Sequence, residues 1–223
     1  MAGPSKSRIV DALLEHHGRT YAEELGIDLA KGTPSVLFRW LCASILLSAR
    51  ISADIAMKAA RALADQGWTT AQKMAKSTWE QRTRTLNGAG YARYDESTSR
   101  MLGDTVGMLL EKYRGDLRRL REEASHDPAA ERRLLKECKG LGDVGVDIFF
   151  REVQVVWDEL YPFAGKRDLD AADKLGLEKD AAALARRVPR EDFPRLTAAL
   201  VRVGLAKDFE GVLEQAGARR TDR

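Results

Sequence analysis

The stretch from Leu134 to Phe150 reads Leu-Leu-Lys-Glu-Cys-Lys-Gly-Leu-Gly-Asp-Val-Gly-Val-Asp-Ile-Phe-Phe. Its three glycines satisfy the G-x-G-x-x-G spacing of dinucleotide-binding turns, but those turns follow a β-strand. The residues in front of this turn, 131–138, have the apolar spacing of a helix instead, with Leu134, Leu135 and Cys138 on one side. The stretch therefore predicts two helices joined by a tight Gly-Leu-Gly turn, a helix–hairpin–helix element at residues 134–150.

Such a turn has the properties of a phosphate-binding site. Gly140 and Gly142 permit a turn with positive φ and leave the backbone bare, so that backbone N–H groups can approach a phosphate oxygen. The second helix begins there and adds the positive end of its dipole, while Leu141 anchors the turn between the helices. The predicted DNA contacts at the hairpin are Lys139, Gly140, Leu141, Gly142, Val144 and Gly145. An ordinary αα-hairpin, whose glycines only cap helices, is the alternative.

Helical spacing of apolar residues continues through the rest of the chain. Asp127-Pro128 has the form of a helix N-cap followed by proline at the first helical position, and it opens a helix predicted to reach Cys138. Convincing alternating runs of β-branched residues are absent from the sequence, so the predicted fold class is all-α. Three apolar stripes carry this prediction: Phe38, Leu41, Cys42, Ile45, Leu46 and Ala49; Val146, Phe149, Phe150, Val153 and Trp157; and Phe193, Leu196, Leu200 and Val203.

The composition limits the class of protein. The chain has 223 residues, with 37 Lys and Arg against 34 Asp and Glu, a formal net charge of +3. This near balance of charges excludes a uniformly basic protein surface but permits a local basic face. The two cysteines, Cys42 and Cys138, exclude a disulfide framework and are too few for a four-cysteine zinc or iron–sulfur site. His16 and His17 point in different directions on a helix, so we predict no metal site.

The location of the protein is also an expectation from the sequence. The first ten residues lack the apolar core of a signal peptide. The longest apolar-leaning run, residues 40–49, is far shorter than the ~20 residues of a membrane span. We therefore expect a soluble, cytoplasmic, monomeric protein with no membrane partner.

Two further segments favour a DNA-binding role for the hairpin. Leu46-Leu-Ser-Ala-Arg-Ile-Ser-Ala-Asp54 precedes an alanine-rich helix, and Leu86-Asn-Gly-Ala-Gly-Tyr91 precedes a predicted helix over 93–102. With the hairpin further along the chain, this ordered set resembles the endonuclease III-like branch of the helix–hairpin–helix DNA glycosylase superfamily.

The resemblance implies a two-lobed helical fold with a cleft between the lobes. A base flipped from damaged double-stranded DNA enters this cleft, and its N-glycosidic bond is cut in base-excision repair. Residues 36–154 would form the lobe with the hairpin, and residues 1–35 and 155–223 the second lobe. Arg50 would lie at the gap that the flipped base leaves, and Arg93 on the DNA side of the cleft; surface arginines without these roles are the alternative. A monovalent cation at the hairpin is compatible with this family.

Three departures from the family pattern bear on activity. Lyase-type members carry a lysine four residues after the first hairpin glycine, where this chain has Val144, so the resemblance implies a monofunctional glycosylase. No cysteine follows Cys138, so we expect no C-terminal iron–sulfur cluster and no other cofactor. In the family, the catalytic aspartate lies about ten residues before an Arg/Lys-Leu-Gly sequence. In this chain that sequence is Lys174-Leu175-Gly176, and the position of the aspartate is occupied by Gly165.

Two nearby carboxylates are candidates for the missing catalytic group. Asp168, with Asp170 as the alternate, would stabilise an oxocarbenium-like sugar from the start of a helix that begins near Lys166. Alternatively, both aspartates only support the helix start. Without a catalytic carboxylate, the chain would be a catalytically silent helix–hairpin–helix DNA-binding protein of the same fold. A helical protein-interaction domain without a DNA role is the third possibility.

Overall fold

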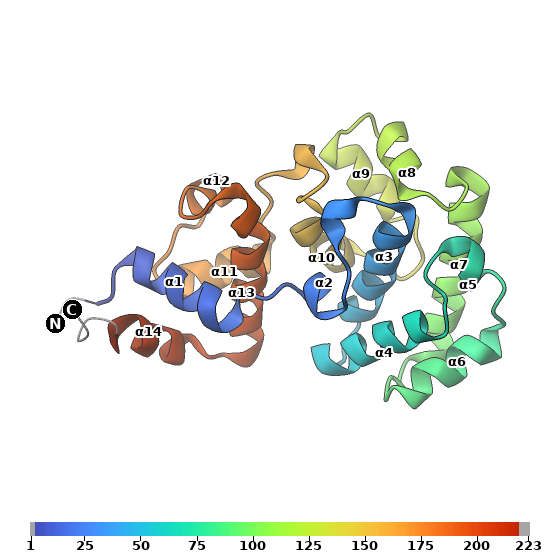
Figure 1. Cartoon of the computed structure of the whole chain (residues 1–223), viewed down its shortest axis with the longest axis horizontal. Helices are drawn as coiled ribbons and strands as arrows, with labels where there is room; N and C mark the ends of the chain where they lie inside the picture. The colour runs from blue at the N-terminus through green and yellow to red at the C-terminus, as the bar shows by residue number, and fades with distance from the viewer. Residues whose placement is uncertain (1–2, 219–223) are drawn as a thin grey trace. The chain divides into compact units, whose positions relative to one another are not determined.

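Every regular element of the described chain is helical. The computed structural model describes residues 3–218, and this range contains α-helices and short 3-10 helices but no β-strand, which confirms the predicted fold class (Figure 1). None of the helices in this range has both the length and the apolar character needed to cross a lipid bilayer. The elements up to the middle of the chain are α1 (Lys6–His17), α2 (Tyr21–Glu24), η1 (Leu29–Lys31), α3 (Pro34–Ser48), α4 (Ala53–Asp65), α5 (Ala71–Met74), α6 (Trp79–Gly88) and α7 (Asp95–Tyr113). The remaining elements are α8 (Leu117–Glu123), α9 (Pro128–Leu135), α10 (Asp143–Val153), η2 (Asp158–Leu160), α11 (Lys166–Lys174), α12 (Ala181–Ala185), η3 (Arg190–Asp192), α13 (Phe193–Ala206) and α14 (Phe209–Ala218).

The chain folds into two compact units. The hairpin unit runs from Leu25 to Glu159. The terminal unit combines the residues up to Glu24 with those from Leu160 onward. Both boundaries differ from the expected ones, which were placed after residues 35 and 154.

Packing explains where the boundaries lie. Leu25, Ile27 and Leu29 are buried, and η1 packs against α3, so this segment belongs to the hairpin unit. At the other boundary, Glu159 accepts hydrogen bonds from Arg121 on α8, which ties it to the same unit.

Helix α3 is the central element of the hairpin unit. It begins with Pro34 at its first position and buries the predicted stripe from Phe38 to Leu46, whereas Ala49, the last residue of that stripe, lies after the end of the helix and is half-buried. Helices α4 and α10 pack against it. The indole N–H of Trp40 donates a hydrogen bond to the carbonyl oxygen of Phe149 on α10, at 3.0 Å. This hydrogen bond joins α3 to the middle of the hairpin's second helix, and the burial of large apolar side chains, worth roughly 1.5–3 kcal/mol each, adds to it.

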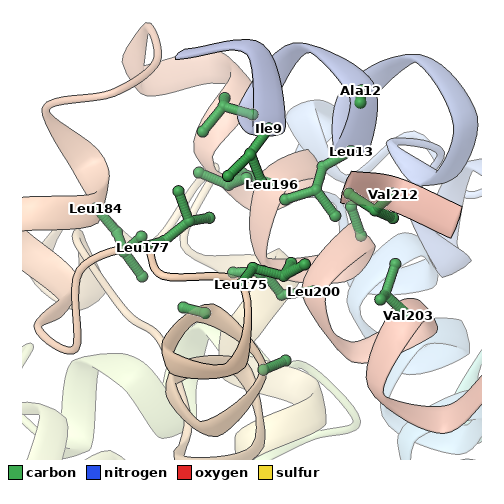
Figure 2. Packing of buried hydrophobic residues seen from close by; sticks show 14 of the residues in the cluster. Ile9, Ala12, Leu13, Leu175, Leu177, Leu184, Leu196, Leu200, Val203 and Val212 are labelled. Carbon is green, nitrogen blue, oxygen red and sulfur yellow. The ribbon is translucent and has the colours of Figure 1, made fainter. Parts of the chain in front are cut away.

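The terminal unit has a core of its own. Helix α13 contacts both α1 and α11, and α14 packs against α1. Figure 2 shows Leu13 of α1, Leu200 of α13 and Val212 of α14 within this core, where all three are buried. The stripe predicted for residues 193–203 is buried in α13, as expected.

The first helix of the hairpin begins as predicted but ends earlier. The Asp127 carboxylate accepts a hydrogen bond from the N–H of Ala130 at 2.7 Å, and Pro128 occupies the first helical position. Helix α9 ends at Leu135 and not at Cys138, because residues 136–140 already form turns that lead toward α10.

Candidate nucleic-acid interface

One of the two turn glycines has the predicted backbone conformation. Gly140 has φ +85°, a value that side-chain-bearing residues rarely adopt. A Cβ at this position would lie 2.9 Å from Met101 Sδ and 3.1 Å from Ile45 Cγ2. Gly142 has φ −84° and is the N-cap of α10, so of the two turn glycines only Gly140 uses positive φ. Its extended conformation is the one that N-cap residues ordinarily adopt.

Leu141 anchors the turn as expected. Its side chain is buried, and its N–H donates to the carbonyl oxygen of Cys138 at 3.0 Å. Gly145 provides the space for it, because a Cβ on Gly145 would lie only 2.7 Å from Leu141 Cδ1. A side chain at position 145 would therefore displace the Leu141 side chain from its place inside the hairpin.

The first turn of α10 presents backbone donors at the surface. Gly142 has no side chain, and the N-cap makes no side-chain hydrogen bond. The N–H groups of a helix's first turn have no partner within the helix, and the helix dipole adds positive potential there. Val144, in this turn, is 42% exposed and is not a nucleophile. Lys139 is also exposed, while its carbonyl oxygen accepts a hydrogen bond from the Thr105 hydroxyl at 3.1 Å. This arrangement suits a phosphate group.

The three segments that carry the family resemblance lie together in the hairpin unit. The Tyr91 hydroxyl donates to the carbonyl oxygen of Leu46 at 3.2 Å, which joins the Gly-aromatic turn to the end of α3. The Ser48 hydroxyl donates to the carbonyl oxygen of Gly140 at 3.4 Å, which joins the end of α3 to the hairpin. Segments that are far apart in the sequence therefore meet at the hairpin turn.

The two predicted arginine contacts lie on the loops next to these joints. Arg50 is exposed and follows the end of α3. Arg93 is exposed, and its guanidinium carbon lies 5.3 Å from the centre of the Tyr94 ring. Tyr91 is fully buried, so it supports the turn and contacts no ligand at the surface. Exposed guanidinium groups are suited to phosphate contacts.

An acidic residue at the same helix start opposes anion binding. Asp143 is the first residue of α10, and its carboxylate accepts hydrogen bonds from Lys136 Nζ at 2.8 and 3.0 Å. The bond from Lys136 lowers the pKa of Asp143, so the carboxylate stays charged at neutral pH. Asp143 was not among the predicted site residues. Its position directly after the turn could have indicated, from the sequence alone, a negative charge next to the proposed phosphate site.

We expect Asp143→Asn to tighten binding to a DNA duplex. Removing a charge at a helix N-terminus changes the interaction with an anion by roughly 0.3–1 kcal/mol, or about two- to fivefold in Kd. Fluorescence anisotropy with a labelled duplex measures the change. Asp147→Asn, one turn further along α10, is the matched control. Weaker binding by Asp143→Asn would contradict a phosphate position at this helix start.

The candidate catalytic carboxylates lie at the start of α11 in the terminal unit. The helix begins at Lys166, as expected, with Gly165 as its N-cap. Asp168 is fully buried, and its Oδ2 accepts a hydrogen bond from the Gly165 N–H at 2.7 Å. Asp170 is paired with Lys166 at 2.7 Å on an exposed face. In this arrangement Asp168 stabilises the helix start and Asp170 forms a surface ion pair worth little.

The cysteines are core residues. Cys42 and Cys138 are buried, and burial raises the pKa of both thiols, that of Cys138 to about 12. Neither thiol is therefore ionised at neutral pH. A four-cysteine iron–sulfur cluster does not fit a chain with two cysteines. Residues 3–218 contain no cluster of three or more His, Cys, Asp or Glu side chains arranged to hold a metal ion.

Comparison with solved structures finds similar folds. A trapped covalent intermediate of endonuclease III with DNA, an estranged-adenine complex, superposes with a TM-score of 0.48 at 17% identity, covering 73% of this chain and 71% of that chain. A non-covalent endonuclease III–DNA complex superposes with a TM-score of 0.49 at 15% identity, covering 84% of this chain and 86% of that chain. Comparison of the sequence with known protein families and with curated proteins gives no match.

Proposed function

We propose that this chain binds double-stranded DNA through the hairpin turn and the first turn of α10, without reading base sequence. The observation that carries the proposal is the joining of α3, the Gly-aromatic turn and the hairpin beside an uncapped helix N-terminus. Backbone N–H groups and arginines bind phosphate oxygens in any sequence. The net charge of +3 is small, so affinity depends on these placed groups.

Duplex binding at several salt concentrations tests this function. We expect a measurable Kd for duplexes of unrelated sequence. The affinity should fall as salt rises, because a few phosphate contacts release counterions. A chain that binds no duplex at low salt would contradict the proposal and favour a protein-interaction domain.

Base excision is the activity that such binding would serve, and the family resemblance of the sequence supports it. The proposed enzyme is a monofunctional, cytoplasmic DNA glycosylase that acts as a monomer on damaged duplex, without a cofactor. Asp168 is the candidate catalytic carboxylate. The buried capping contact of Asp168, and the absence of a side chain at Gly165, favour instead the catalytically silent alternative. A direct activity measurement decides between them.

Duplexes that carry uracil, an alkylated purine, an oxidised purine or an abasic site are incubated with the protein in EDTA and then treated with hot alkali. Strand cleavage of a duplex with a damaged base that needs alkali and exceeds the cleavage seen without protein supports a monofunctional glycosylase. The abasic duplex, which alkali cleaves unaided, is scored only before alkali treatment. Cleavage of any duplex without alkali contradicts the monofunctional proposal, and cleavage no greater than without protein supports the silent alternative.

The role of Asp168 has its own test if cleavage occurs. Asp168→Asn retains an oxygen that accepts the Gly165 N–H, so helix α11 keeps its cap while the negative charge is lost. We expect this variant to lose at least 100-fold in rate, since removal of one charge-stabilising group costs on the order of 10²–10³. Asp170→Asn is the matched control and should retain activity. Full activity of a folded Asp168→Asn would remove Asp168 from the site.

A further inference from the structure

A basic groove lies in the hairpin unit apart from the hairpin turn. It has a volume of ≈ 860 Å³ and lies along α4 and α6, which pack against each other and are drawn side by side in Figure 1. Lys58 and Arg61 line it from α4, Arg84 from α6, and Lys76 from the loop between α5 and α6. Asp65 is the one carboxylate among its lining residues. The groove therefore has an excess of positive charge.

Three of the four basic residues of the groove, Lys58, Lys76 and Arg84, are available to a ligand. Lys58, Arg61 and Asp65 are spaced three and four residues apart, so they share one face of α4 over about 10 Å of helix length. Lys58, Lys76 and Arg84 are exposed, and none of them forms an ion pair with another described residue. Exposed like charges that line one groove without internal partners favour a polyanionic ligand.

An aromatic side chain completes the groove. Trp68, in the loop between α4 and α5, is half-buried and lines the groove together with Gln66 and Gln81. A basic groove with an aromatic side chain is the usual platform for single-stranded nucleic acid, because the cations follow the phosphates and the ring stacks on an unpaired base. A double helix is convex and broad, so its phosphates would meet only the rim of such a concave surface.

One end of the groove leads toward the hairpin. Gly88 and Ala89 line the groove, and the chain then enters the turn at Gly90 and Tyr91. The Tyr91 hydroxyl donates a hydrogen bond to the carbonyl oxygen of Leu46 near the end of α3, and Ser48 of the same helix is hydrogen-bonded to the hairpin turn. The groove and the hairpin turn are therefore connected through the Gly-aromatic turn and the end of α3, which offers a path for a strand that leaves DNA bound at the hairpin.

We propose that this groove binds a single-stranded nucleic-acid segment continuous with the duplex held at the hairpin, so that the preferred ligand is a junction between duplex and single strand. The position of the duplex in this proposal rests on the proposed function, whereas single-strand binding by the groove does not.

The test compares three fluorescently labelled ligands by anisotropy with the full chain: a blunt duplex, the same duplex with a single-stranded oligo(dT) tail, and oligo(dT) alone. Lys58→Glu/Arg84→Glu reverses two charges in the groove. Arg119→Glu/Arg133→Glu reverses two exposed charges that do not line it, and circular dichroism verifies that both variants are folded. For the wild type we expect the tail to tighten binding at least tenfold. The groove variant should lose that gain while keeping the blunt-duplex affinity, and the control variant should retain both.

The outcomes separate the two proposals. Binding of the blunt duplex with no gain from the tail overturns the groove proposal alone. Equal losses in the two double variants also overturn it, because they indicate an effect of bulk charge. Binding of oligo(dT) that the groove variant loses, without binding of the blunt duplex, supports the groove and contradicts the proposed duplex function. Absence of binding to all three ligands overturns both.

Discussion

Gly140→Val is expected to lower the free energy of unfolding by about 2–5 kcal/mol and to abolish duplex binding. Two costs add. A left-handed backbone costs roughly 1–2 kcal/mol for an ordinary residue, and the new side chain would overlap Met101 and Ile45, which lie 2.9 and 3.1 Å from its Cβ position. Relief of this overlap moves the turn away from α3. A thermal melt should show a midpoint lowered by roughly 10 °C.

Gly142→Ser is the informative counterpart, because it separates folding from binding. A Cβ at Gly142 meets no heavy atom within 4 Å, and the backbone already has N-cap geometry. Serine is a favourable N-cap residue, so the melting temperature should stay equal or rise. Its hydroxyl would accept an N–H group of the first turn that we assign to phosphate, so duplex affinity should fall severalfold. An unchanged melt for Gly140→Val, or unchanged affinity for Gly142→Ser, would contradict the described hairpin.

The starts of helices and the apolar face of α3 were predictable from the sequence, because interactions within a few residues determine them. The apolar stripe of α3, the Asp127-Pro128 start of α9 and the start of α11 at Lys166 follow from helical periodicity and capping preferences, which operate within a few residues. The turn was predictable from its glycines. Which glycine takes positive φ was not, because Gly140 is constrained by Met101 and Ile45 from other helices.

Features that depend on distant segments were not predictable from the sequence. Asp168 was placed at a helix start, but its complete burial results from packing within the terminal unit. The basic groove joins residues of α4 and α6 that have no common motif. Glu131 falls among charged residues on a short helix and would be assigned to a solvated face, yet it is fully buried beside Glu159.

Glu131 belongs to a buried carboxyl cluster in the hairpin unit. No described residue donates a hydrogen bond to its carboxyl oxygens. Glu159 accepts hydrogen bonds from Arg121 at 2.6 and 2.5 Å, and His126 Nδ1 lies 3.8 Å from it. Burial, and then a hydrogen bond to Glu159 and its charge, raise the pKa of Glu131. Burial acts in the same direction on Glu159, but the bonds from Arg121 and Glu131 outweigh it and lower the pKa of Glu159. The pair therefore holds one proton, on Glu131, at neutral pH.

This shared proton predicts that stability falls as pH rises above the ordinary glutamate value of 4.5. Above that pH the unfolded chain has released the proton of Glu131 while the folded chain keeps it, so unfolding releases a proton and becomes easier at higher pH. Glu159 has the opposite effect on stability. Its lowered pKa stabilises the folded chain above pH 4.5, and this stabilisation is lost as the pH falls below that value. The cluster should therefore contribute most stability near that pH. Above pH 4.5, the free energy of unfolding falls by at most about 1.4 kcal/mol per pH unit, or on the order of 2–4 kcal/mol between pH 5 and 8.

Urea unfolding of the wild type and of Glu131→Gln across this pH range measures the effect. The glutamine keeps a donor for Glu159 and has no proton to release, so the variant should lose most of the fall in stability between pH 5 and 8. Glu122→Gln, at an exposed position of α8, removes a carboxylate outside the cluster and should retain the wild-type slope. A Glu131→Gln variant that loses stability as steeply as the wild type would show that the buried proton does not reside on Glu131.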